Sequence, residues 1–228
     1  MTSIMRLALV GSAALSFVGA NGTAQAQQQA PQSPNMTFFV ASAGLGKGAD
    51  LGGLEGADRH CQQLAQGAGA GNKTWRAYLS SNTNAANPGA TANARDRIGK
   101  GPWQNFKGTV IATSVEDLHS PNSKMSGENS LTERGTRVSG FGMTPNWHDV
   151  LTGSDMEGKA FPGNMNLTCG NWTSSGTGVT VVGHIDRTGG ADTVYQHSWN
   201  SAHMSRACGQ ADLIATGVNG LFYCFAAQ

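Results

Sequence analysis

The pattern of apolar and polar positions predicts short strands, one clear helix and unusually long loops. Residues 37–41 (TFFVA) are apolar and β-prone, which predicts a first strand. Residues 179–184 (VTVVGH) and 221–225 (LFYCF) have the same character and predict two later strands. An amphipathic helix, with its cysteine toward the core, is predicted where apolar residues recur at helical spacing: Ala57, Cys61, Leu64, Ala65 and Ala68.

Two shorter patterns add to this outline. Residues 75–80 (WRAYLS) alternate, which predicts a half-buried strand with Trp75, Ala77 and Leu79 inside and the other three residues outside. Residues 114–117 (SVED) resemble a short capping box and predict one or two helical turns ending near His119. Long irregular stretches separate these elements, above all 83–109 and 121–170. The predicted class is α+β, with short antiparallel strands and long loops.

The first residues predict export. Residues 1–26 combine one positive charge, an apolar run and a small-x-small cleavage site at 24–26, as a signal peptide does. Residues 27–36 are rich in Gln and Pro and predict a disordered linker, so that 37–228 form the single domain. The apolar run is too short for a membrane span, and no second long one follows. We expect a secreted or periplasmic protein, and the leader's composition favours a bacterial one.

Charge narrows the class of partner. Removing Arg6 with the signal takes the formal net charge from +1 to zero, so we expect neither nucleic acid nor an anionic membrane as a partner. Charged residues make up only 13% of a chain that contains 32 glycines, which indicates a loop-rich protein with a surface made hydrophilic by uncharged side chains.

The four cysteines indicate an oxidising compartment. Four cysteines allow three pairings, and the spacing alone does not choose among them.

A resemblance to a known family becomes visible at several ordered anchors. Residues 57–61 (ADRHC) and 74–81 (TWRAYLSS) resemble the helix and following strand of endostatin-type domains, the C-terminal domains of collagens XV and XVIII. Three more anchors follow in the same order: 105–108 (NFKG), 148–152 (HDVLT) and 169–172 (CGNW). The resemblance covers roughly residues 37–227 and implies a C-type-lectin-like fold. It also implies two nested disulfides, Cys61–Cys224 and Cys169–Cys208.

The metal sites of these families do not carry over to this chain. Calcium-binding C-type lectins use Glu-Pro-Asn and Trp-Asn-Asp segments, whereas the nearest segments here are 161–164 (FPGN) and 199–201 (WNS). Endostatin domains bind zinc through N-terminal histidines, and residues 35–37 contain none. His197 and His203 follow Asp192 without a zinc-motif spacing, and we interpret His148-Asp149 as a turn. We therefore predict no cofactor, since no motif supports calcium or zinc, although both metals stay open as alternatives.

Sugar can also be bound without a metal, by aromatic faces and by side chains that hydrogen-bond hydroxyl groups. The predicted loops hold many residues of these kinds: Trp147, His148, Asp155, Glu157, Asn164, Asn166, Tyr195, His197, Trp199, Asn200 and His203. We single out seven as candidate ligand contacts, although long loops also need such side chains to bond their own backbone: Trp147, Asp155, Glu157, Asn164, Trp199, Asn200 and His203.

Nothing in the chain predicts catalysis. It has no Gly-x-Ser-x-Gly elbow and no metalloprotease helix motif, and the nested pairing leaves no cysteine free as a nucleophile. We predict a non-catalytic binding module that recognises a glycan or another extracellular surface polymer through its long-loop face. The alternative is a protein-binding or structural envelope module without a sugar site, whose partner would be a surface protein.

Overall fold

The computed structural model describes residues 31–82, 91–163 and 165–227, and it confirms a mixed α+β class. The predicted signal peptide (1–26) and the candidate residue Asn164 lie outside the described residues. The elements follow in this order: β1 (Phe38–Val40), α1 (Gly53–Gly67), β2 (Trp75–Ala77), α2 (Ala94–Arg97), β3 (Trp103–Gln104), β4 (Val110–Ala112), α3 (Val115–Leu118), β5 (Asp149–Leu151), α4 (Cys169–Trp172), β6 (Val181–His184), β7 (His203–Met204), α5 (Gln210–Thr216) and β8 (Val218–Ala226).

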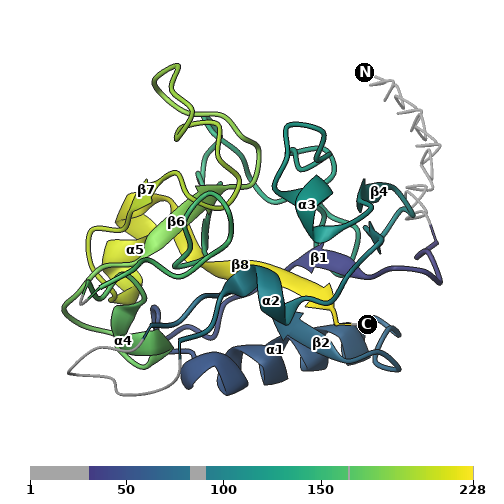
Figure 1. Cartoon of the computed structure of the whole chain (residues 1–228), viewed down its shortest axis with the longest axis horizontal. Coiled ribbons are helices and arrows are strands. Elements are labelled where there is room, and N and C mark those ends of the chain that lie inside the picture. Colours follow the sequence, from purple (N-terminus) through teal and green to yellow (C-terminus); the bar gives the residue numbers. More distant parts are fainter. Residues whose placement is uncertain (1–30, 83–90, 164, 228) are drawn as a thin grey trace, which may run out of the picture.

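The long strand β8 organises the main sheet, whose order is β1-β8-β5-β6-β7, with β2 also paired to β8 (Figure 1). β8 pairs antiparallel with β1 and β2 but parallel with β5. The prediction of short antiparallel strands is therefore confirmed for the other strand pairs of the described residues and wrong for β5–β8. A parallel pair needs a long crossover, and the chain between β5 and β8 supplies one through β6, β7 and α5.

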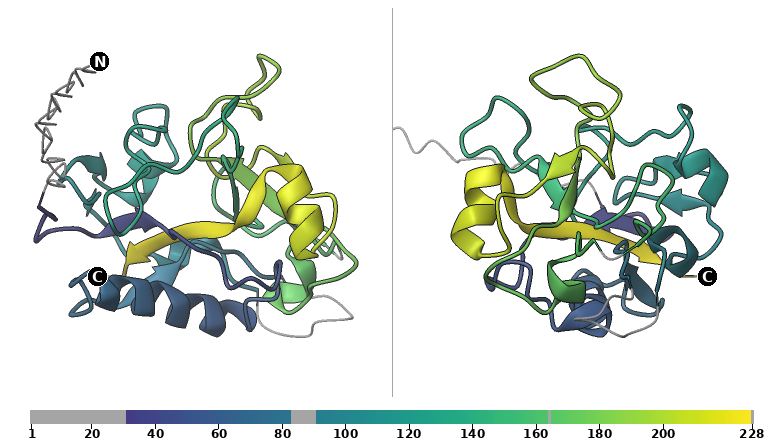
Figure 2. Two further views of the ribbon diagram at one scale, coloured as in Figure 1. Left: turned by 180° about the vertical axis from the view of Figure 1, so that it is seen from behind. Right: turned by 60° about the vertical axis from the view of Figure 1, so that its left-hand side comes forward.

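Both faces of β8 are buried, which explains its nearly continuous apolar sequence. Phe222 and Cys224 belong to the core cluster beneath α1, together with Cys61. Tyr223 and Phe225 belong to a second cluster on the opposite face. Figures 1 and 2 show α1 along one face of the sheet and long loops over the other. The loops therefore cover an aromatic core of their own.

The two disulfides are nested as the resemblance implied. Cys61 on α1 is joined to Cys224 on β8, and Cys169 on α4 is joined to Cys208 before α5. All four cysteines are fully buried. The outer bridge fixes α1 against the centre of the sheet, and the inner one fixes the loop before β6 against the segment that leads into α5.

Several local predictions are confirmed and one is partly wrong. The predicted helix is α1, and Ser114 caps α3 by accepting a hydrogen bond from the backbone amide of Asp117 at 3.1 Å. The strand predicted over 75–80 ends at Ala77, and Tyr78 and Ser80 are buried rather than outside. The loops covering this face bury them, which alternation within one strand does not reveal. Helix α5 was not predicted, because it buries only Leu213 and so lacks a clear apolar stripe.

The packed part of the protein reaches back into the predicted linker. Met36 is fully buried in the core, and the backbone amide of Ser33 donates to the carbonyl of Phe106 at 2.7 Å. None of the helices in the described ranges has the length and apolar character that a bilayer-spanning helix needs.

Candidate functional site

Three adjoining hollows run between the 155–165 loop and the 194–204 segment, and we call them together the loop-face groove. The first and second share Met156, and the second and third share Phe161, Tyr195 and Ser201, so the three hollows lie side by side in a row. Their volumes are about 190, 290 and 370 Å³. The groove is thus elongated rather than a single closed pocket.

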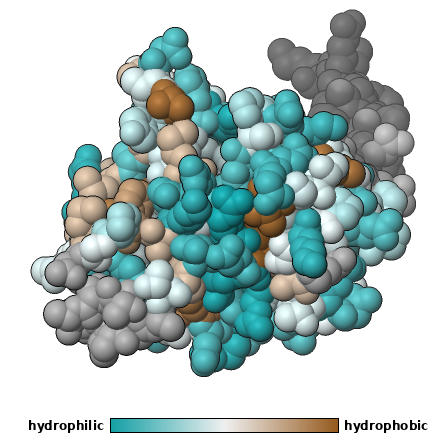
Figure 3. All heavy atoms as spheres, viewed as in Figure 1, coloured by the Kyte–Doolittle hydropathy of each residue, from teal (hydrophilic) through white to brown (hydrophobic). Residues whose placement is uncertain are grey.

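The groove changes character along its length. The first hollow is lined by Arg187, Trp199 and Asn200 among others, and the middle one by Asp155 and Glu157. The third is predominantly apolar, with these lining residues: Phe161, Met165, Leu167, Val181, Tyr195, Ser201, Ala202, His203 and Met204. Figure 3 shows a mostly hydrophilic face on which apolar residues gather over β6 and β7. One end therefore offers polar groups and the other an apolar surface.

The groove brings together five of the seven candidate residues predicted from the sequence: Asp155, Glu157, Trp199, Asn200 and His203. Trp147 lies elsewhere, half-buried in a separate hollow with Pro145 and Leu221. Of the two remaining candidates, Trp147 is separated from the groove, and Asn164 lies outside the described residues.

The side chains of Trp199 and Asn200 are buried and make their contacts inside the protein. The Trp199 side chain is only 4% exposed and packs against Tyr78 and Tyr223, with ring centroids 4.8 and 5.4 Å away. The Asn200 amide nitrogen donates to the Tyr78 hydroxyl at 2.9 Å and to the Asp155 carbonyl at 3.0 Å. The exposed aromatic side chain of the groove is instead Tyr195, which is 58% exposed.

A buried tyrosine–histidine pair supports the floor of the groove. The Tyr78 hydroxyl lies 2.7 Å from Nε2 of His119, and Nδ1 of His119 lies 2.7 Å from the Val115 carbonyl. Because a carbonyl only accepts, we place the His119 proton on Nδ1, and Nε2 accepts from Tyr78. Burial raises the pKa of Tyr78 far above its ordinary value and lowers the pKa of His119. Both groups are therefore neutral near pH 7, as a structural hydrogen bond requires.

The loop over this pair is held by Asp155. Its Oδ1 accepts from the backbone amides of Glu157 at 2.9 Å and Lys159 at 2.8 Å. Gly158 has a φ of +76°, and a Cβ there would lie 2.4 Å from both the Tyr78 hydroxyl and the His119 ring. Only glycine lets the loop approach so closely, so the shape of the middle hollow depends on this position.

A second constellation, the histidine–aspartate cluster, lies at the ends of neighbouring strands and is defined by His148, Asp149, His184, Asp186 and His203. Asp149 begins β5, His184 ends β6 and His203 begins β7. The β5–β6 register pairs Asp149 with His184, and the β6–β7 register places His203 opposite Val182. The interpretation of His148-Asp149 as a turn is wrong, because Asp149 is a strand residue and both side chains are buried together.

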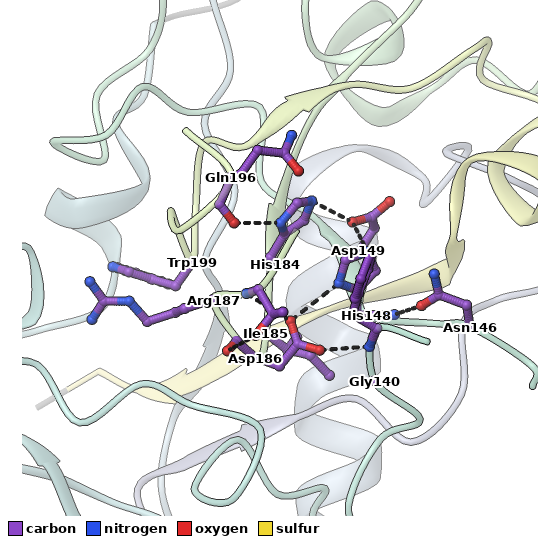
Figure 4. A network of polar contacts seen from close by, with 12 residues as sticks. Gly140, Asn146, His148, Asp149, His184, Ile185, Asp186, Arg187, Gln196 and Trp199 are labelled. Carbon is purple, nitrogen blue, oxygen red and sulfur yellow. Dashed lines mark hydrogen bonds and ion pairs between the residues drawn. The ribbon is translucent and has the colours of Figure 1, made fainter. Parts of the chain in front are cut away.

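The Asp149 carboxylate lies among the imidazoles. Its Oδ1 lies 3.3 Å from Nε2 of His148 and 3.1 Å from Nε2 of His184, as Figure 4 shows. Its Oδ2 lies 3.5 Å from Nε2 of His203. The side chain of Asp149 is fully buried, that of His184 is 1% exposed and that of His203 is 33% exposed. The cluster is thus closed on the sheet side and reaches the groove through His203.

The ionisation of the cluster follows from this geometry. Burial pushes the pKa of Asp149 upward, but the contacts with His184, His203 and His148 outweigh it and leave the pKa lowered. The contact with Asp149 raises the pKa of His203. Asp149 is therefore a buried anion, and each neighbour in ion-pair contact with it is an imidazole.

The sequence analysis missed this cluster because its members come from separate strands with no motif spacing. The only available signal was an adjacent His-Asp pair at a predicted element boundary, with another histidine ending a predicted strand at 184. No protein-family model matches the chain, and no curated protein matches it.

Proposed function

We propose that the protein is a non-catalytic binding module that recognises a glycan or another extracellular surface polymer through the loop-face groove. The observation that carries this proposal is the row of three adjoining hollows, in which each hollow shares lining residues with the next. A chain of several sugar units needs an elongated site, whereas a compact metabolite would need a closed pocket.

The chemistry of the groove suits a polymer rich in hydroxyl groups. Tyr195 offers an exposed aromatic face, against which the CH groups of a sugar ring can pack. Glu157, whose side chain is 65% exposed, offers a carboxylate that accepts hydrogen bonds from hydroxyls. Arg187 supplies donors in the first hollow. The groove thus combines polar groups for orientation at one end with apolar surface for affinity at the other.

The family resemblance supports the same proposal. A C-type-lectin-like fold would account for the nested disulfides and for a ligand face built from long loops. Disulfides persist in oxidising compartments, which is compatible with a secreted or periplasmic location. Export through a cleaved signal peptide belongs to this proposal as well.

The alternative function, a protein-binding or structural envelope module, is favoured by the third hollow. Met165 and Met204 are 54% and 57% exposed there, and methionines suit contact with varied apolar side chains. The burial of Trp199 points the same way, because it removes one aromatic platform from sugar binding.

A glycan array probed with the oxidised protein, in calcium and again in EDTA, tests the proposal. We expect binding in both buffers, and we expect Tyr195→Ala to abolish it. Phe141→Ala is the matched control, since Phe141 is an aromatic residue 45% exposed outside the groove. No binding in either buffer by folded protein would overturn the glycan proposal in favour of a protein partner. Binding that only Phe141→Ala removes would move the site away from the groove.

A further inference from the structure

The hydrogen bonds of the histidine–aspartate cluster fix which nitrogen of each ring carries the proton. Nδ1 of His184 lies 2.8 Å from the carbonyl of Gln196, and Nδ1 of His203 lies 3.1 Å from the carbonyl of Met204. Nδ1 of His148 lies 3.2 Å from the Asp186 carboxylate. All three partners only accept, so we place the proton of each neutral ring on Nδ1. Each Nε2 then carries a lone pair.

These lone pairs all face a buried carboxylate. In neutral rings the Nε2 atoms of His148, His184 and His203 have no proton to offer the Asp149 oxygens 3.1 to 3.5 Å away. Among the described residues, both Asp149 oxygens and Nε2 of His184 lack a hydrogen-bond partner. Buried polar atoms are rarely left unpaired, and an uncompensated buried charge is costly. The arrangement needs positive charge between these atoms, and a bound cation would supply it.

We propose that the histidine–aspartate cluster is a binding site for a divalent transition-metal ion of the zinc class, with His148, His184, His203 and Asp149 as ligands. Among the described residues, His148, Asp149 and His184 place their ligand atoms within 4.8 Å of one another, whereas His203 lies outside that set and contacts Oδ2 of Asp149 at 3.5 Å. This inference is independent of the proposed glycan binding, since the ion is held by the scaffold beside the groove.

The separations around Oδ1 of Asp149 match those of a tetrahedral zinc site for two ligands, His148 and His184. Zinc bonds to nitrogen and oxygen are about 2.0–2.1 Å long, which places neighbouring ligand atoms of a tetrahedron roughly 3.3 Å apart. The three observed Nε2–Oδ separations are 3.3, 3.1 and 3.5 Å. To complete the coordination, the His203 ring would have to turn toward His148 and His184, since in this structure it contacts the other oxygen of Asp149.

The surroundings orient the ligands as metal sites require. The Nδ1–H group of each ring donates to a carbonyl or carboxylate oxygen. This hydrogen bond fixes the orientation of the ring and raises the basicity of Nε2 as a metal ligand. Asp186 is itself held by the backbone amide of Phe141 at 2.7 Å. On the far side Gly217 has a φ of +117°, and a Cβ there would lie 2.9 Å from Oδ2 of Asp149. The backbone therefore closes over the carboxylate, and any larger residue would crowd it.

The donor set selects the class of metal. Three imidazole nitrogens and one carboxylate suit zinc, cobalt or nickel, whereas calcium takes six to eight oxygen ligands. In the competing arrangement no metal is bound, and protonated imidazoles balance the charge of Asp149 instead. The two arrangements differ in stoichiometric metal binding, which makes them separable by experiment.

The first test uses the oxidised wild-type protein, stripped with EDTA and titrated with Zn²⁺ and with Co²⁺ alone. We expect one submicromolar site per chain, a visible cobalt spectrum typical of tetrahedral coordination, and X-ray absorption showing nitrogen and oxygen ligands at about 2.0 Å. Absence of a stoichiometric site would overturn the proposal and favour the protonated cluster. A six-coordinate, oxygen-only environment would overturn it as well.

Variants then locate the ion. Asp149→Asn and His184→Gln should abolish tight zinc binding, and His203→Gln should weaken it by about tenfold or more. His203→Gln is the substitution least expected to disturb folding, because the His203 side chain is partly exposed and its replacement leaves no cavity in the core. His197→Gln is the matched control, since His197 forms an exposed pair with Asp192 at 2.9 Å and lies outside the cluster. Tight binding that survives in folded His203→Gln and His184→Gln, or that is lost in His197→Gln, would contradict the assignment.

Discussion

The Asp58 carboxylate lies 2.6 Å from the guanidinium of Arg97, joining α1 to the end of α2. Its other oxygen lies 2.7 Å from Arg76, and the backbone amide of Ala77 also donates to the carboxylate at 2.9 Å. The Asp58 side chain is only 9% exposed and that of Arg97 17%. One carboxylate therefore holds α1 and α2 to strand β2 at the edge of the sheet.

We predict that Asp58→Ala lowers the free energy of unfolding by about 3 kcal/mol, because it leaves a buried guanidinium and a buried backbone amide without their partner. Urea unfolding measures the change. Glu55→Ala is the matched control on the same helix, since its contact with Arg59 spans 3.9 Å between two exposed side chains. Equal effects of the two substitutions would show that burial is not what makes Asp58 important.

The two disulfides should contribute unequally. By loop entropy the outer bridge, with a sequence separation of 163, is worth about 5 kcal/mol and the inner one, with 39, about 4 kcal/mol. We expect the double substitution Cys61→Ala/Cys224→Ala to lower the urea midpoint more than Cys169→Ala/Cys208→Ala. The reverse order would mean that local packing around the inner bridge, rather than loop length, dominates.

The stability of the protein should fall on mild acidification through His119. Burial lowers the pKa of His119 below its ordinary 6.5, so the unfolded chain binds this proton more readily than the folded one. This contribution is fully present above about pH 6.5 and is lost as the pH falls toward the lowered pKa. His197 and His203 act oppositely because their pKa values are raised. Chemical denaturation from pH 8 to pH 5 should therefore show less acid loss in His119→Gln than in the wild type. An unchanged slope would contradict the assignment.

Gly158 should be intolerant of a side chain. Gly158→Ala combines left-handed backbone strain with a contact 2.4 Å from Tyr78 and His119, and we expect a loss of about 3 kcal/mol. Gly163→Ala isolates the strain, because Gly163 has a φ of +82° but nothing lies within 4 Å of its Cβ position. It should cost about 1 kcal/mol. Thermal unfolding of both variants distinguishes the close approach from the backbone conformation alone.

If zinc occupies the histidine–aspartate cluster, it should stabilise the folded protein by mass action. At a free zinc concentration one hundred times the Kd, we expect a gain of about 2.7 kcal/mol, which EDTA reverses. Calorimetry of the wild type and of His203→Gln, each with and without zinc, measures this gain. A rise in melting temperature as large in His203→Gln as in the wild type would place the stabilising ion elsewhere.

The sequence predicted those parts of the fold that are periodic or locally encoded. Helix α1 is long enough to show its apolar spacing, and α3 shows its cap at Ser114. The disulfide pairing followed from the family resemblance. Strands such as β5 and β3 have only three and two residues, too few for a period to be visible.

The candidate sites depended on long-range pairing that the sequence does not display. The types of residue in the groove were predicted, but not that the 155–165 loop would lie beside the 194–204 segment. The cluster requires the register that sets Asp149 opposite His184, and a shift of one residue would separate them. Asp58 lies in a segment recognised by its resemblance, yet its partner Arg97 lies in a stretch predicted to be irregular.

The central position of β8 has a consequence for how the chain acquires its structure. Phe38 pairs with Phe225 and Trp75 with Ala226, so β1 and β2 find their partner only after residues 218–226 have been synthesised. Contacts so distant in the chain form slowly. During synthesis β1 and β2 therefore stay without their partner strand until then, although β5, β6 and β7 can already pair with one another. The main sheet and the Cys61–Cys224 bridge are completed only once β8 has been made.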